Sequence, residues 1–135
     1  MHIAQLEAAQ AKLLPGHLGI QTVEASTEKV VGKLTVAEHH CTVGGILHGG
    51  AIMALADSLG AVGAFLNLEP GSRTSTVESK TNFLRAAKQG ATVTATSRLV
   101  NKGRRLMLWQ TEVRDENERL LAVVSQSQII LPAGS

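Results

Sequence analysis

The chain has 135 residues, of which 44% are hydrophobic and 18% charged, so it can bury a sizeable core but is too short for two typical domains. The formal net charge is +2, and one Trp, two Phe and no Tyr leave few side chains on which bases could stack, so the composition does not favour nucleic-acid binding. The single cysteine excludes an internal disulfide framework and fits a reducing compartment. Neither a run of 18 apolar residues nor a secretory signal pattern occurs, and we therefore expect a cytoplasmic protein with one domain over residues 1–135 and a core over about 18–131.

The first half of the chain predicts a short helix, two strands and a long helix. Helix-forming composition ends at Pro15-Gly16, and the alternation of apolar residues that follows is typical of strands. The expected elements are a helix over 2–14, strands over 18–24 and 29–37, an irregular loop over 38–48, and a helix from about Gly49 to Leu66.

The second half is β in character. Strands are expected over 74–84, 91–101, 105–114 and 118–131, separated by short turns at 88–90, 102–104 and 115–117. Connections this short predict an antiparallel meander, because parallel pairing needs a crossover of about a dozen residues. The expected fold class is α+β, with an antiparallel sheet of five or six strands around one long central helix and a short N-terminal helix before it.

The central helix carries apolar residues on all sides and has no charged stripe, so we expect the sheet and a second subunit to enclose it. Asp57 is the only ionisable residue between Gly49 and Leu68, and none of its neighbours three or four positions away can pair with it. A buried lone carboxylate is costly, which indicates a functional group. The alternative is that Asp57 lies on a solvated edge or bonds a backbone group across the sheet.

The start of this helix is a candidate oxyanion hole. Gly49 and Gly50 lie where unpaired N–H groups and the positive end of the helix dipole favour negative charge, and they have no Cβ to keep a carbonyl away. Alternatively, the two glycines serve only a tight turn. Eight residues separate Gly49 from Asp57, or about 12 Å at 1.5 Å per residue, so the two groups of one chain cannot act on one carbonyl. An enzyme built from them requires a two-fold dimer with two composite sites.

The segment HGGAIMALADSLG (48–60), followed by TVESKTNFLRAA (76–87) and NKGRR (101–105), resembles the signature of the hotdog-fold acyl-CoA thioesterases. It is most similar to the PaaI-like group of the 4-hydroxybenzoyl-CoA thioesterase superfamily, and Asp rather than Glu at position 57 favours that group. The resemblance extends from about Leu18 to Leu131. It implies a hotdog fold, an acyl-CoA substrate, no separate cofactor, and a homodimer that often pairs into a tetramer.

The resemblance also implies roles for single residues. Gly49 donates its N–H to the thioester oxygen, and Asp57 of the partner subunit acts as general base or nucleophile. His48 positions the thioester, and Thr76 orients the water. Thr42 stands where many relatives have Asn or Gln, which puts that substrate contact in doubt.

Basic side chains near strand ends are candidates for the phosphates of coenzyme A, because Arg and Lys bind phosphate oxygens well. The candidates are Lys80, Arg85, Lys102, Arg104 and Arg105. The alternative for each is a solvated loop charge.

Two other patterns of residues do not predict a functional site. His39, His40, Cys41 and His48 have no regular ligand spacing, so no metal is predicted, and adjacency of Cys41 to His40 does not make a catalytic pair. Met107 and Trp109 are expected in the core.

The predicted function is hydrolysis of an aryl- or short/medium-chain acyl-CoA. The alternatives are a hotdog dehydratase or hydratase, whose His belongs to an HFP-like element that the chain lacks, and a non-catalytic acyl-CoA-binding module.

Overall fold

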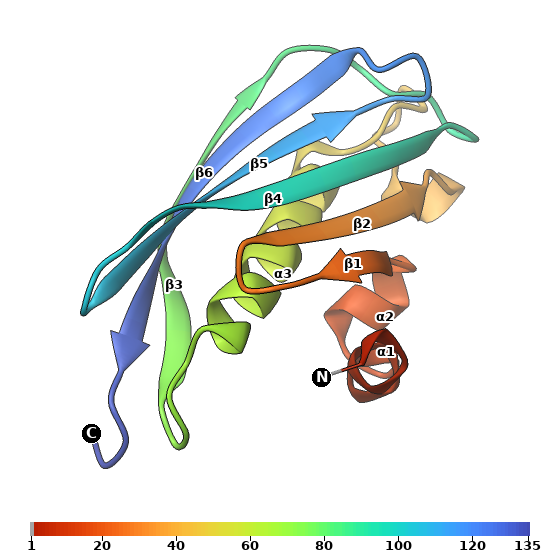
Figure 1. The fold of residues 1–135 in the computed structure, drawn as a ribbon. Coiled ribbons are helices and arrows are strands. Elements are labelled where there is room, and N and C mark those ends of the chain that lie inside the picture. Colours follow the sequence, from red (N-terminus) through yellow and green to blue (C-terminus); the bar gives the residue numbers. More distant parts are fainter. Residues whose placement is uncertain (1) are drawn as a thin grey trace.

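A computed structural model describes residues 2–135. One six-stranded antiparallel sheet curls over one side of a long helix, and two short helices lie beside the first strand (Figure 1). The elements are α1 (Ile3–Gln10), α2 (Leu14–Leu18), β1 (Gln21–Ala25), β2 (Lys29–Thr35), a 3-10 turn (Glu38–His40), α3 (Gly49–Leu66), β3 (Arg73–Phe83), β4 (Thr92–Lys102), β5 (Leu106–Arg114) and β6 (Leu120–Leu131). The expected α+β hotdog architecture is confirmed.

Helix α3 has the predicted bounds. It begins after His48, whose ring nitrogen Nδ1 accepts a hydrogen bond from the Gly50 N–H, and it ends at Asn67, whose side-chain amide donates to the Gly63 carbonyl. The helix is long and apolar enough to cross a membrane, but the sheet covers it as a core helix. Within one chain only one side is buried, while Met53 and Phe65 remain exposed.

Between α3 and the sheet the core is formed by alternate strand residues. Fully buried side chains include Leu34, Val93, Val113, Leu55 and Leu59, and each contributes about 1.5–3 kcal/mol by leaving water. The predicted core positions Met107 and Trp109 are also fully buried, which confirms them. The Trp109 ring lies directly on Gly63, where a Cβ atom would come within 2.3 Å of it.

The N-terminal prediction is partly wrong. The first helix ends at Gln10, and Pro15-Gly16 lies inside the second helix, α2, instead of ending the first. Proline is tolerated in the first turn of a helix, where its missing N–H would have no partner in any case. Gly19, with φ of 77°, ends α2 in the left-handed region, and Leu18 therefore belongs to that helix and not to β1.

The meander prediction holds for β1–β2 and for β4–β5–β6 but is wrong for β3. The strand order is β1-β2-β4-β5-β6-β3, so β3 pairs with β6 at the sheet edge and not with β4. The chain passes along α3 to this far edge, and residues 84–91 then cross the end of the sheet back to β4. At the start of this crossing, the backbone N–H groups of Leu84 and Arg85 donate to the Leu121 carbonyl of β6. A period of two identifies strands but not their neighbours. Among the described residues, the outer edge of β3 has no strand partner.

Candidate active site

Asp57 is half-buried on the side of α3 that faces β3 and β6. Its Oδ1 oxygen accepts a hydrogen bond from the side-chain amide nitrogen of Gln126 at 3.2 Å and lies 2.6 Å from the Thr76 hydroxyl. The single hydrogen of that hydroxyl is shared between Asp57 Oδ1 and Oε1 of Gln128, which is also within hydrogen-bond distance. The second oxygen, Oδ2, has no hydrogen bond to any residue between 2 and 135. The carboxylate is therefore held by one oxygen and leaves the other available.

A buried polar network extends from this carboxylate into the sheet. Gln126 and Gln128 are fully buried, and the side-chain nitrogen Nε2 of Gln126 also donates to the side-chain oxygen Oε1 of Gln128 at 2.9 Å. The Gln128 amide donates to the Thr74 hydroxyl at 3.1 Å. The sequence prediction included Thr76 but missed both glutamines. Their signal was present, because Gln126 and Gln128 occupy alternate positions of β6, on the same face as the apolar Ala122 and Val124.

At the start of α3 the expected pair of free N–H groups is reduced to one. The Gly50 N–H is bound to His48 Nδ1 at 2.7 Å, which corrects the prediction that both glycines offer a donor. The Gly49 N–H has no partner among the residues described here. Because Nδ1 of His48 accepts, the proton of the neutral ring is on Nε2, and this exposed nitrogen is a donor.

A groove of about 370 Å³ opens beside Gly49. One wall comes from the loop before α3 and the other from the end of β3 and the segment after it, with Thr42, Ile46, Gly49, Phe83, Leu84 and Arg85 among the lining residues. The structure thus brings three predicted site residues to one groove, namely Thr42, Gly49 and Arg85. The contribution of Phe83 was missed by sequence reasoning. Its ring lies on Gly49, where a Cβ atom would be 3.1 Å from two ring carbons.

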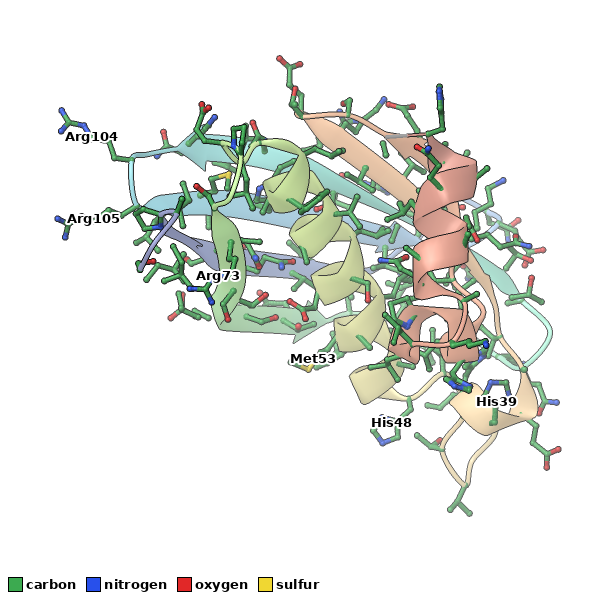
Figure 2. All side chains as sticks on the ribbon, turned by 90° about the horizontal axis from the view of Figure 1, so that it is seen from below. His39, His48, Met53, Arg73, Arg104 and Arg105 are labelled. Carbon is green, nitrogen blue, oxygen red and sulfur yellow. The ribbon has the colours of Figure 1, made fainter. Side chains whose placement is uncertain are left out.

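The other basic candidates lie elsewhere. Lys80 is exposed on the outer face of the sheet, away from the inner face that carries Gln126, and its Nζ donates to Asn82 Oδ1. Lys102 donates to the Asn67 carbonyl at the C-terminal end of α3. Figure 2 shows Arg104 and Arg105 extending from the β4–β5 hairpin, far from His48 at the opposite end of the helix. One chain therefore does not gather all five basic side chains.

Gly49 and Asp57 also remain separate within one chain. Helix α3 is continuous from Gly49 to Leu66, so the eight-residue interval keeps the two positions about 12 Å apart along the axis. A carboxylate and an oxyanion donor that act on one carbonyl must both approach it to about 3 Å. Within one chain, therefore, the two groups do not act on the same carbonyl.

His40 has a structural role. Its Nδ1 accepts from the Ala37 N–H at 2.9 Å and its Nε2 contacts the Leu18 carbonyl at 2.6 Å, which uses both ring nitrogens of this buried side chain. In the described part of the chain no group of three or more His, Cys, Asp or Glu residues is arranged to hold a metal ion.

This arrangement matches a known family. Residues 44–122 match the sequence model described as the thioesterase superfamily. A Deinococcus radiodurans protein named as an esterase is 38% identical over 121 residues, which span 86% of this chain and 75% of that protein. The 1,4-dihydroxy-2-naphthoyl-CoA hydrolase of Listeria monocytogenes is 34% identical over 106 residues, spanning 78% of this chain and 85% of the hydrolase.

Solved structures agree. The thioesterase HI1161 of Haemophilus influenzae superimposes with a TM-score of 0.93 at 26% identity, covering 100% of this chain and 94% of that one. PaaI of Thermus thermophilus shares the fold, with a TM-score of 0.79 at 25% identity over 85% of this chain and 96% of PaaI. The chain therefore belongs to the thioesterase superfamily, and it is a thioester hydrolase with the PaaI-like hotdog fold.

Proposed function

We propose that the protein hydrolyses an aryl- or short/medium-chain acyl-CoA to the free acid and coenzyme A. Asp57 of one subunit supplies the carboxylate, and the Gly49 N–H of its partner stabilises the oxyanion. Coenzyme A is part of the substrate, and no separate cofactor takes part. A cytoplasmic location stays a prediction.

The observation that carries this proposal is the state of Asp57. Its Oδ1 is held by Thr76 and Gln126 while Oδ2 is free of protein partners in the described chain, so the group is both oriented and able to accept a proton. In the general-base route, Oδ2 takes a proton from water as the water oxygen bonds to the thioester carbon. The carbonyl electron pair moves onto oxygen, where the Gly49 N–H donates to it. Collapse of this intermediate breaks the C–S bond, and the departing thiolate takes up the proton.

A nucleophilic route uses the same atoms in another order. Oδ2 attacks the carbonyl carbon, the thiolate leaves, and water then cleaves the resulting anhydride. In both routes the Nε2–H of the exposed His48, the residue before Gly49, is available to position the thioester. The contact between the Thr76 hydroxyl and Asp57 supports the prediction that Thr76 orients the attacking water.

Two features support a homodimer. The outer edge of β3 has unpaired backbone groups in the described chain, and such an edge is a template for another strand. Exposed apolar side chains adjoin it, including Met53 on α3 and Val77 and Phe83 on β3. A two-fold axis at this edge, with the two α3 helices antiparallel, brings each Asp57 toward the Gly49 of its partner. Pairing of two such dimers into a tetramer is part of the same prediction.

In such a dimer some of the basic residues can bind the phosphates of coenzyme A. Asn67, next to the β4–β5 hairpin, lies ten residues beyond Asp57, so the hairpin of the subunit that supplies Asp57 lies about 15 Å further along its helix from the composite site. In this arrangement Arg104 and Arg105 can reach coenzyme A phosphates at a distance from the reacting carbonyl, while Arg85 lies in the Gly49 groove. Lys102 and Lys80, which have protein partners, are weaker candidates.

The test is a hydrolysis screen with aryl-, phenylacetyl- and straight-chain acyl-CoAs, including 1,4-dihydroxy-2-naphthoyl-CoA, the substrate named for the Listeria relative, with a thiol reagent as readout. Asp57→Asn keeps an oxygen for Thr76 and Gln126, so the fold should persist while kcat falls about 10²- to 10⁴-fold. The same change at the only other aspartate, Asp115 in the β5–β6 turn, is the control and should leave kcat unchanged. Full activity of Asp57→Asn, or no hydrolysis of any acyl-CoA, would refute the proposal.

A further inference from the structure

The Gln126 side chain is fully buried beneath α3, where it contacts the Asp57 carboxylate. Its amide nitrogen has two hydrogens and uses both, one on Asp57 Oδ1 at 3.2 Å and one on Gln128 Oε1 at 2.9 Å. Its own oxygen, Oε1, is buried and has no partner among the residues described. The Gln126 side chain thus donates to Asp57 and to Gln128, while its own oxygen accepts no hydrogen bond in the described chain. A buried acceptor without a partner lowers the stability of the fold.

The orientation of this amide is fixed by its surroundings. Turning it over would place Oε1 against the oxygens of Asp57 and Gln128, which both accept. Gln128 is held in turn, because its amide nitrogen donates to the Thr74 hydroxyl, which donates to the Ile129 carbonyl. This chain of donors fixes the Gln126 N–H toward Asp57 from within the sheet.

Helix α3 has a gap that fits the same amide. Gly60 lies three residues after Asp57 and so on the same face of the helix. A Cβ atom at position 60 would lie 2.4 Å from the Gln126 side-chain carbonyl carbon. Glycine in the middle of a helix is destabilising relative to alanine, so its presence here favours room for Gln126 over helix stability.

We infer that Gln126 is a positioning residue for Asp57, and that Gly60 makes the space in which its amide operates. The inference rests on the proposed function. Gln126 does not touch the substrate. It restrains Oδ1, together with Thr76, so that Oδ2 points away from the sheet toward the composite site.

The inference is tested with Gln126→Met, which keeps the length of the side chain but has no donor, and with Gly60→Ala, which displaces the amide sterically. Each should lower kcat about 10- to 100-fold, because misplacing a reacting group has an effect of this size. KM should change less than about two-fold, because the binding contacts remain. The Gly60→Ala/Gln126→Met double variant should be no slower than the slower single variant, since both act on one contact.

Gly63→Ala is the matched control. It places a Cβ atom 2.3 Å from the Trp109 ring, the same kind of intrusion one turn further along α3 but away from Asp57. It should lower the thermal midpoint at least as much as Gly60→Ala while kcat stays near that of the wild type. A general packing defect would instead reduce kcat in both glycine variants.

Several results overturn the inference. These are a folded Gln126→Met protein with wild-type kcat, a rise in KM alone, or additive losses in the double variant. If Gln126→Met does not fold, Gly60→Ala with unchanged kcat overturns it equally. Activity in Asp57→Asn would refute the proposed function itself, whereas an inactive Asp57→Asn beside an active Gln126→Met refutes only the positioning role.

Discussion

Replacing Gly49 by proline removes the one N–H at the start of α3 that has no partner in the described chain. Proline favours the first helical position, which Gly49 occupies, because its fixed φ suits the helix and no hydrogen bond is lost within it. The residue before a proline must be extended, and His48 already has φ of −65° and ψ of 136°. The helix and its cap should therefore survive the substitution.

The expected loss follows from the number of donors. The Gly50 N–H is bound to His48, so the Gly49 N–H is the backbone donor left for the oxyanion. Loss of one such donor lowers kcat about 10²- to 10³-fold, or about 2.7–4 kcal/mol of transition-state stabilisation. Gly49→Ala is the control, because it keeps the N–H and adds only a Cβ atom 3.1 Å from the Phe83 ring. Since that exposed ring can shift by a few tenths of an ångström, Gly49→Ala should lose less than about 10-fold.

The assay is steady-state release of coenzyme A from the best substrate of the screen, with thermal unfolding of both variants measured alongside. The reasoning predicts that Gly49→Pro and Gly49→Ala unfold at similar temperatures and differ widely in kcat. Equal kcat values in the two folded variants would show that the Gly49 N–H does not bind the oxyanion.

Three further predictions concern the chemical role of Asp57, the binding of the coenzyme A part of the substrate, and the packing of the core. In a single turnover in oxygen-18 water, label should enter the Asp57 carboxyl if Asp57 is the nucleophile and water cleaves the anhydride at the Asp57 carbonyl carbon, whereas a general base leaves label only in the product acid; mass spectrometry of the protein detects the labelled carboxyl. Arg104→Ala and Arg105→Ala should raise KM more than they lower kcat, because phosphate contacts act equally on ground and transition states, and an unchanged KM contradicts the assignment. Trp109→Ala should lower the free energy of unfolding by about 3–5 kcal/mol in a denaturant titration, since the ring is fully buried; a loss below about 1 kcal/mol would contradict its place in the core.

Local patterns predicted the elements of this fold well. The bounds of α3 follow from the largely apolar segment between Gly49 and Asn67, whose only charged residue is Asp57, and the strands follow from alternation. The place of β3 did not follow, because pairing with β6 depends on where α3 delivers the chain, which is a property of the whole fold. The prediction that Pro15 ends the first helix was wrong for a local reason, because proline can begin a helix as well as end one.

The same division applies to the site. Asp57 stood out because a single charge in an apolar helix is costly, and Gly49 because helix starts have free donors. The partners of Asp57 were harder to predict, because Thr76 and Gln126 lie 19 and 69 residues away in sequence and meet it only through the β3–β6 register. His48 shows the opposite case, in which a local contact with Gly50 changed the number of available donors.

The central claim, that Asp57 and Gly49 act across two subunits, is tested most directly by mixing two inactive proteins. Asp57→Asn and Gly49→Pro subunits are unfolded together and refolded, or coexpressed, so that they exchange freely. Each mixed dimer then contains one site with Asp57 from one subunit and Gly49 from the other, and an equal mixture should regain about a quarter of wild-type activity if the sites are shared between two-fold related chains. If each site lay within a single chain, no mixed dimer would contain an intact site, and activity no higher than that of the two parents would contradict the account.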